Sequence, residues 1–256
     1  MSAVVERDDC PTHGAFEVRE FRLPVPGAKA IRLGCPQCAR EQHEAEEEAR
    51  QAAEIEQVRR RSRIPGLYLA MTLDGYPADL PQQRSAIGVC RGWLNRYPVL
   101  RSSAERGSWL VFSGPVGTGK TGMACAVADE LMRVGRSVVY HTPSSLRQWC
   151  WDARHRGSCE ADAVHALVWC ELLVIDELAA NKPSEAELSL LSDVLDRRYM
   201  DGRPVILITN RTRGELSSHL PERLVDRIEQ RAGWVVCNWP SLRKHINDQR
   251  LVVKDA

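Results

Sequence analysis

The sequence predicts an α/β fold, with a central parallel β-sheet flanked by helices and a smaller module in front of it. Short runs of branched apolar residues recur along the second half of the chain, and segments of helical periodicity separate them. Three cysteines and one histidine stand apart among the first 38 residues. The chain has 256 residues, which is enough for one large domain and an appendage.

The composition is that of a globular protein. Hydrophobic residues make up 43% of the chain and charged residues 27%, and the formal net charge is +1, so any contact with nucleic acid is expected to use a local basic patch. No apolar run approaches the roughly 20 residues that span a bilayer, and the N-terminus lacks a signal-peptide pattern. We therefore expect a cytoplasmic protein without a membrane partner, in which cysteines are reduced and either bind metal or are buried.

Residues 1–38 carry two pairs of metal-binding side chains, Cys10-x2-His13 and Cys35-x2-Cys38. Zinc takes four nitrogen or sulfur ligands, and a two-residue spacer lets one turn supply two of them. The alternating stretches between the pairs predict a β-hairpin. We expect a zinc ribbon with a structural Zn²⁺, because the protein fills all four positions; the alternative is a tail without metal. The other cysteines are expected to be small buried hydrophobes: Cys90, Cys125, Cys150, Cys159, Cys170 and Cys237.

Residues 39–63 predict a long charged helix, because they contain no glycine or proline and are rich in Ala, Glu, Gln and Arg. Two interpretations of this helix remain: a solvated spacer, or an arm that holds another protein together with the ribbon. His43 is expected to face solvent. The sequence "RIPG" at 63–66 ends the helix, so residues 64–256 are expected to form the main domain.

The segment "GPVGTGKT" at 114–121 matches the P-loop pattern between a predicted strand, 109–112, and a predicted helix, 123–132. Its glycines allow backbone N–H groups to surround a phosphate, and the helix N-terminus favours the anion. Lys120 is expected to contact the β- and γ-phosphates, and the Thr121 hydroxyl to bind Mg²⁺. The expected nucleotide contacts are Gly114, Pro115, Val116, Gly117, Thr118, Gly119, Lys120 and Thr121.

Three polar residues follow later apolar strands of the predicted sheet. Asp176 and Glu177 end the run 172–175, and Asn210 ends a later strand. Open α/β sheets bind ligands at this edge. We expect Asp176 to hold Mg²⁺ together with Thr121. Glu177 is expected to polarise the attacking water as a general base, and Asn210 to orient that water. With Lys120, these residues predict a Mg²⁺-dependent ATPase.

The order of these motifs, followed by "ERLVDRI" at 222–228, resembles the AAA+ ATPases. The longer stretch "ERLVDRIEQRAGWVVCNWPSLR" at 222–243 is similar to the C-terminal signature of the DnaC-type helicase loaders and of their IstB-like relatives, the transposase-helper ATPases. The resemblance covers about residues 64–246. The zinc ribbon and helix in front resemble those of phage- and prophage-type loaders. The expected fold is therefore an AAA+ P-loop NTPase domain behind a zinc ribbon and a helix.

The resemblance also implies how the arginines act. ATP would lie between subunits of a ring or spiral, with up to six copies on the helicase, and Arg227 would contact the neighbour's γ-phosphate as an arginine finger. Arg223, one turn earlier, would be a second phosphate or interface residue. Arg243 would approach the γ-phosphate within its own subunit. The alternative is a surface helix with the ion pairs Glu222–Arg223 and Asp226–Arg227.

The function that the resemblance implies is ATP-dependent loading of a DnaB-type replicative helicase onto single-stranded DNA, with hydrolysis controlling release. One alternative is an IstB-like transposition helper that binds duplex DNA and recruits a transposase. Another is an adaptor with a structural nucleotide. Residues that could contact DNA, or instead belong to the core and its solvated surface, are Arg147, Trp149, Trp151, Arg154, His155 and Arg156, with Lys182 and Ser184 by family position.

Overall fold

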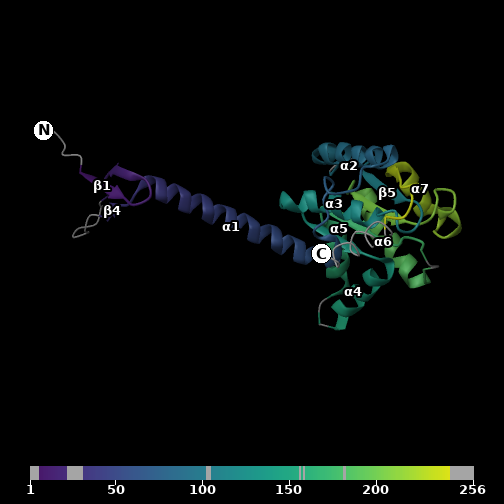
Figure 1. The fold of residues 1–256 in the computed structure, drawn as a ribbon. Coiled ribbons are helices and arrows are strands. Elements are labelled where there is room, and N and C mark those ends of the chain that lie inside the picture. The colour runs from purple at the N-terminus through teal and green to yellow at the C-terminus, as the bar shows by residue number, and fades with distance from the viewer. Residues whose placement is uncertain are drawn as a thin grey trace, which may run out of the picture. The chain divides into compact units, whose positions relative to one another are not determined.

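The computed structural model describes residues 6–21, 31–101, 105–155, 157, 159–180 and 183–242. The chain divides into two compact units, residues 1–54 and 55–256. Helix α1 (Pro36–Ser62), a continuous helix in Figure 1, begins in the first unit and ends in the second. It starts three residues before the predicted 39–63, at a proline, a residue that is favoured in the first helical turn.

Short strands and the start of α1 build the first unit. Strand β1 (Arg7–Cys10) pairs antiparallel with β2 (Gly14–Glu17), and β3 (Arg19–Phe21) pairs antiparallel with β4 (Ile31–Leu33). The β3–β4 pair confirms a hairpin between the two Cys/His pairs. The β1–β2 pair was not predicted, because its strands are short and polar and its turn is the first Cys/His pair itself.

A five-stranded parallel sheet forms the centre of the second unit. Its strands lie in the order β6-β7-β8-β5-β9, so the first strand of this sheet in the chain, β5, lies between the fourth and the fifth. The strands are β6 (Val138–His141), β7 (Leu172–Ile175), β8 (Val205–Thr209), β5 (Trp109–Ser113) and β9 (Ala232–Val236). The predicted parallel sheet is confirmed, and β9 extends it beyond the strands expected from apolar runs.

Helices cover both faces of this sheet. They are α2 (Pro81–Leu100), α3 (Lys120–Arg133), α4 (Pro143–His155), α5 (Glu160–Trp169), α6 (Glu185–Met200) and α7 (Glu222–Arg231), with the 3₁₀ turns η1 (Gly66–Tyr68) and η2 (Leu216–Ser218). Side chains alternate between the two faces along β5. Leu110 and Phe112 join a core with α2 and α3, whereas Trp109 and Val111 join a core with α4, α5, α6 and α7.

Five of the six cysteines expected in the core are buried there, and Cys159 is the exception. Cys159 is exposed and is the N-cap residue of α5, where its side chain makes no capping hydrogen bond. Among the described residues, no helix is both long and apolar enough to cross a membrane.

Candidate functional site

The P-loop connects strand β5 to helix α3. Three of its glycines have positive φ angles, 143° at Gly114, 87° at Gly117 and 85° at Gly119, which side chains other than hydrogen rarely allow. The Lys120 ammonium is almost buried and donates to the carbonyl oxygens of Gly114 and Pro115, both at 2.7 Å. Because α3 starts at Lys120, its free N–H groups face the loop and favour an anion there.

The segment after β9 packs against the outside of this loop. A Cβ at Gly114 would overlap the carbonyl oxygen of Cys237, and one at Gly117 would overlap the Ser241 side chain. Leu242 N donates to the Gly117 carbonyl at 2.8 Å. The glycines are therefore needed for packing within the protein as well as for the phosphate approach that the sequence predicts.

Two aromatic side chains that sequence reasoning missed also hold the loop. The Tyr76 hydroxyl donates to the Thr118 carbonyl at 2.6 Å, and the Trp239 indole N–H donates to the same oxygen at 2.8 Å. Both rings are buried. The sequence carries no periodic signal for these contacts, because Tyr76 and Trp239 approach the loop from segments far apart in the chain.

The P-loop meets the carboxyl end of β7 at Asp176. The Thr121 hydroxyl donates to Asp176 Oδ2 at 2.8 Å, and the Tyr140 hydroxyl donates to the same oxygen at 2.7 Å. The backbone N–H of Glu177 donates to Asp176 Oδ1 at 2.6 Å. The structure thus brings together the predicted hydroxyl and carboxylate. These oxygen donors fit Mg²⁺, which prefers one or two carboxylates together with substrate phosphates.

Glu177 lies at a strained turn beside this carboxylate. Its φ is 56° and that of Ala179 is 59°, a conformation that costs free energy for residues with a Cβ and that often occurs at functional sites. The turn is held by the neighbouring strand, because Thr209 Oγ1 donates to the Leu178 carbonyl at 2.6 Å. Glu177 and Asn210, at the ends of adjacent strands, both have exposed side chains.

The two predicted finger arginines lie on α7 and face α6. Arg227 pairs with Asp196 and lies 5.0 Å over the Tyr199 ring, and Arg223 pairs with Asp196 Oδ2 at 3.2 Å. The Arg223 side chain is 74% exposed and that of Arg227 only 9%. The alternative expected ion pairs for Arg223 and Arg227 with acidic residues of α7 itself. The structure instead pairs both arginines with Asp196, which lies on α6. Arg243 lies outside the described residues.

A surface pocket of about 340 Å³ lies at these arginines. Its walls include the half-exposed Trp169 and the exposed Met200, together with Asp196, Arg223 and Arg227. The residues that line the pocket belong to α5, α6 and α7, with Asp201 directly after α6. None of them belongs to the P-loop. The arginines therefore form a surface separate from the phosphate-binding loop.

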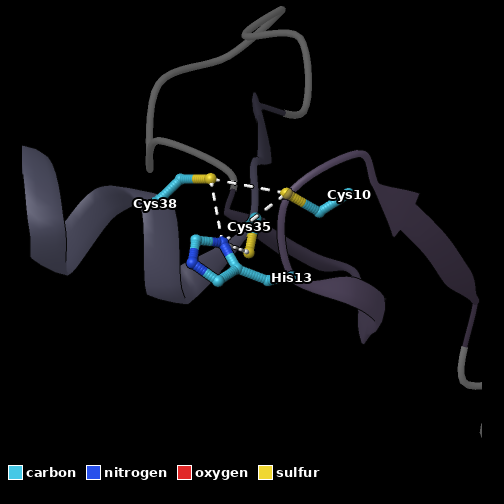
Figure 2. A group of neighbouring side chains, drawn as sticks. All are labelled: Cys10, His13, Cys35 and Cys38. Atoms are coloured by element: carbon cyan, nitrogen blue, oxygen red, sulfur yellow. Dashed lines mark hydrogen bonds between the residues drawn. The ribbon is translucent and has the colours of Figure 1, made fainter.

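The four predicted metal ligands come together in the first unit, as Figure 2 shows. His13 Nδ1 lies 3.3 Å from the sulfur of Cys38 and 3.7 Å from those of Cys10 and Cys35. A tetrahedral zinc site with ordinary bond lengths places its ligand atoms roughly 3.5 Å apart, so this donor set and spacing fit zinc. Backbone N–H groups of Thr12 and His13 lower the pKa of Cys10 to about 6, which favours the thiolate that binds metal.

Glu41 is a further member of this cluster that the sequence did not indicate. Its Oε1 lies 2.9 Å from His13 Nε2, and this hydrogen bond raises the pKa of His13 to about 9. Carboxylates commonly hold the second nitrogen of a metal-binding histidine and so orient its ring. His43, on the same helix, is exposed as expected.

The residues considered for DNA contact differ in their surroundings. Trp149 is half-buried, stacks on the His141 ring at 5.2 Å and lies under Arg63. Trp151 is 52% exposed, and its ring lies 3.8 Å from that of His155 in a tilted arrangement. Arg147 and Trp151 line a pocket of about 310 Å³. Ser184 caps α6 by accepting from the Glu187 N–H. Arg156 and Lys182 lie outside the described residues.

Comparison with known proteins identifies the family. A family model described as IstB-like ATP-binding protein matches residues 101–249. The replicative helicase loader DnaC of Escherichia coli K12 is 30% identical over 204 residues, which are 78% of this chain and 80% of DnaC. The chain belongs to the IstB/DnaC family. DnaC of Buchnera aphidicola subsp. Acyrthosiphon pisum is 27% identical over 76% of this chain and 78% of that protein.

Solved structures show that this family member has the AAA+ fold. A crystal structure of the DnaC helicase loader aligns with a TM-score of 0.59 and 22% identity over 67% of this chain and 99% of that one. A crystal structure of DnaI aligns with a TM-score of 0.58 and 19% identity over 70% of this chain and 94% of that one. The expected AAA+ P-loop domain is confirmed, and with it an ATP-binding protein of this family.

Proposed function

We propose that the protein is an ATP-dependent loader of a DnaB-type replicative helicase. The observation that carries this proposal is the 30% identity to DnaC over four-fifths of that protein, which extends well beyond the P-loop. The proposed task is to bind the helicase and place it on single-stranded DNA in the cytoplasm. Hydrolysis of ATP then controls release, through contacts that differ between the two nucleotide states.

The proposed chemistry is hydrolysis of the γ-phosphate by a water held at the edge of the sheet. Lys120 and the P-loop N–H groups bind the phosphates, and Thr121 and Asp176 hold Mg²⁺, which neutralises charge on the phosphate oxygens. Glu177 takes the proton of the attacking water, and Asn210 orients that water. Their exposed side chains on adjacent strands support this assignment.

Arg227 is proposed to complete the site of a neighbouring copy in a ring or spiral. Its position on a surface away from its own P-loop supports action in trans. Because Arg227 is buried against Asp196, this ion pair must open or turn before the guanidinium reaches a phosphate. Arg223 is exposed and would make the first contact, and Arg243 is proposed to act within its own subunit.

Mixing two inactive variants tests this arrangement. Lys120→Ala removes phosphate binding and Arg227→Ala removes the finger, so each is expected to hydrolyse ATP poorly alone. A mixed assembly contains interfaces with an intact P-loop and an intact finger, so its activity should exceed the sum of the two. Activity that never exceeds the sum, with ATP binding by Arg227→Ala intact, would refute the finger assignment.

The zinc ribbon and α1 are proposed to dock on the helicase. Up to six copies would do so, and the AAA+ domain would hold the single-stranded DNA. Co-purification with a replicative helicase in ATP and Mg²⁺ tests this with the whole chain and with a version that starts at Ile55. The second version keeps Arg59, which pairs with Asp129 of α3. Binding by the whole chain alone is expected; binding by neither would refute the loader proposal.

A second candidate function is an IstB-like transposition helper, because the matching family model is described as IstB-like ATP-binding protein. This helper would share the ATP site but bind duplex DNA and recruit a transposase. Competition between single-stranded and duplex DNA of equal length separates the two functions. Preference for the duplex, with no helicase bound, would favour the transposition helper.

A further inference from the structure

Tyr140 contacts the carboxylate at the centre of the ATP site from a strand that carries none of the recognised motifs. It is the third residue of β6, opposite Val174 of β7, and its ring belongs to the core between the sheet and α3. From there its hydroxyl reaches past the end of β7 and donates to Asp176 Oδ2 at 2.7 Å.

The hydrogen bonds on Asp176 come from three separate elements. Tyr140 of β6 and Thr121 of α3 both donate to Oδ2, and the backbone N–H of Glu177 donates to Oδ1. Asp176 is 5% exposed, so these donors rather than solvent determine how its carboxylate is turned. Thr121 and Glu177 have proposed roles of their own in the reaction, whereas the Tyr140 hydroxyl has no other acceptor among the contacts described for it.

The Tyr140 hydroxyl is a hydrogen-bond donor to this carboxylate. A hydrogen bond to a carboxylate is stronger than one between two neutral groups, so losing this donor should matter for how Asp176 is held. The contact therefore favours one orientation of the carboxylate, with Oδ2 turned toward both Tyr140 and Thr121.

We propose that Tyr140 is a positioning residue for the Mg²⁺-binding carboxylate. Its hydroxyl holds Asp176 Oδ2 where the Thr121 hydroxyl can donate its proton to that oxygen and keep a lone pair for the cation. This inference rests on the proposed Mg²⁺-dependent ATPase and extends it to a residue on β6. Tyr140 contacts neither the nucleotide nor the reacting water.

The test is nucleotide binding as a function of Mg²⁺ with the whole chain carrying Tyr140→Phe. Binding of a fluorescent ATP analogue is measured in EDTA and then over a Mg²⁺ titration. The variant is expected to bind like the wild type in EDTA. Its half-saturating Mg²⁺ concentration is expected to rise about tenfold, the scale on which one hydrogen bond to a charged group changes an equilibrium.

Tyr97→Phe is the matched control. Tyr97 is also buried, and its hydroxyl donates to the Glu171 carbonyl at 3.1 Å, away from the P-loop. Losing that hydroxyl should leave the Mg²⁺ titration unchanged, even where thermal unfolding shows a similar loss of stability. Tyr140→Phe removes only the hydroxyl and keeps the ring in the core, so it is expected to fold, and its thermal unfolding is measured before the titration.

Equal Mg²⁺ dependence in Tyr140→Phe and the wild type, with normal Mg²⁺-dependent hydrolysis by the wild type, would overturn the inference and leave the proposed function intact. A wild-type chain that binds nucleotide without any response to Mg²⁺ would overturn both. A shift of the same size in Tyr97→Phe would assign the effect to general loosening of the core and would also overturn the inference.

Discussion

Replacing Asp129 by asparagine should loosen the end of α1 from the ATPase domain. Asp129 lies on α3, and its side chain is 2% exposed. Arg59 of α1 donates to Oδ1 from Nε at 2.8 Å and from Nη2 at 2.6 Å, and Arg133 donates to Oδ2 from Nε at 2.7 Å. One carboxylate thus joins α1 to the helix that begins with Lys120.

The expected cost follows from these three hydrogen bonds. A bond to a charged group contributes about 1.5–3 kcal/mol and a neutral one about 0.5–1.5 kcal/mol, so the amide loses about 1 kcal/mol per bond. The arginines are 25% and 47% exposed and can recover part of this from water. We therefore expect the free energy of unfolding to fall by about 2 kcal/mol.

Urea unfolding of the whole chain measures this loss, and hydrogen exchange locates it. Amides of residues 55–62 should exchange faster in Asp129→Asn, while those of the sheet change only with global stability. Asp193→Asn is the control, because its exposed i,i+4 pair with Arg197 should contribute less than about 1 kcal/mol.

A double-mutant cycle with Arg59→Met decides the mechanism. If the ion pair is the cause, the two changes together should cost less than their sum, because each alone already removes the contact. Additive effects, or a loss in Asp129→Asn no larger than in Asp193→Asn, would refute the reasoning.

Three further predictions concern metal, packing and pH. Zinc chelation should remove the first unit's strand signal and leave unfolding of the ATPase domain unchanged, because the only buried side chains described in residues 6–54 are the predicted metal ligands Cys10 and Cys35. Unchanged strands after verified metal loss would contradict this. Gly114→Ala should weaken ATP binding and lower the free energy of unfolding by at least about 2 kcal/mol, because of backbone strain and overlap with Cys237. Gly92→Ala is the control: this helical glycine has open space around it, so alanine should raise the free energy of unfolding by about 0.5–1 kcal/mol. Burial, with a smaller effect from a nearby arginine, lowers the pKa of His141 to about 4 from 6.5. As the pH falls, the unfolded chain protonates His141 before the folded chain does, so the free energy of unfolding should fall by about 2 kcal/mol between about pH 7 and pH 5. Urea unfolding at both pH values measures this difference, and His141→Phe should remove it.

Much of the ATPase domain could be predicted from short stretches of the chain. The apolar runs predicted strands β5, β7 and β8, because a strand buried on both faces has few polar positions. The P-loop pattern and the strand end predicted a shared Mg²⁺ site for Thr121 and Asp176, and the structure places these two side chains in contact. The spacing of the Cys/His pairs likewise predicted a four-ligand cluster, because a two-residue spacer brings two ligands to one point.

Contacts between distant segments could not be predicted in this way. Asp196, which pairs with Arg223 and Arg227, is on another helix, so the local charge pattern of α7 indicated the wrong partners. Glu41 faces His13 only because the Cys/His cluster brings the start of α1 beside the first turn. Trp149 and Trp151 look alike in the sequence, yet the packing of α4 buries more of one than of the other.

The amino-acid order alone determined the parts of the candidate ATP and metal sites that depend on local geometry, since a P-loop, a strand tip and a Cys/His turn each form from a few consecutive residues. Only the folded sheet decided which side chains support those parts. Strand order places Tyr140 beside Asp176, and the segment after β9 places Cys237 and Trp239 on the P-loop. Such contacts depend on the packing of distant elements. A buried hydrogen-bond donor needs an acceptor in the folded core, and the spacing of residues in the sequence does not indicate which acceptor that is.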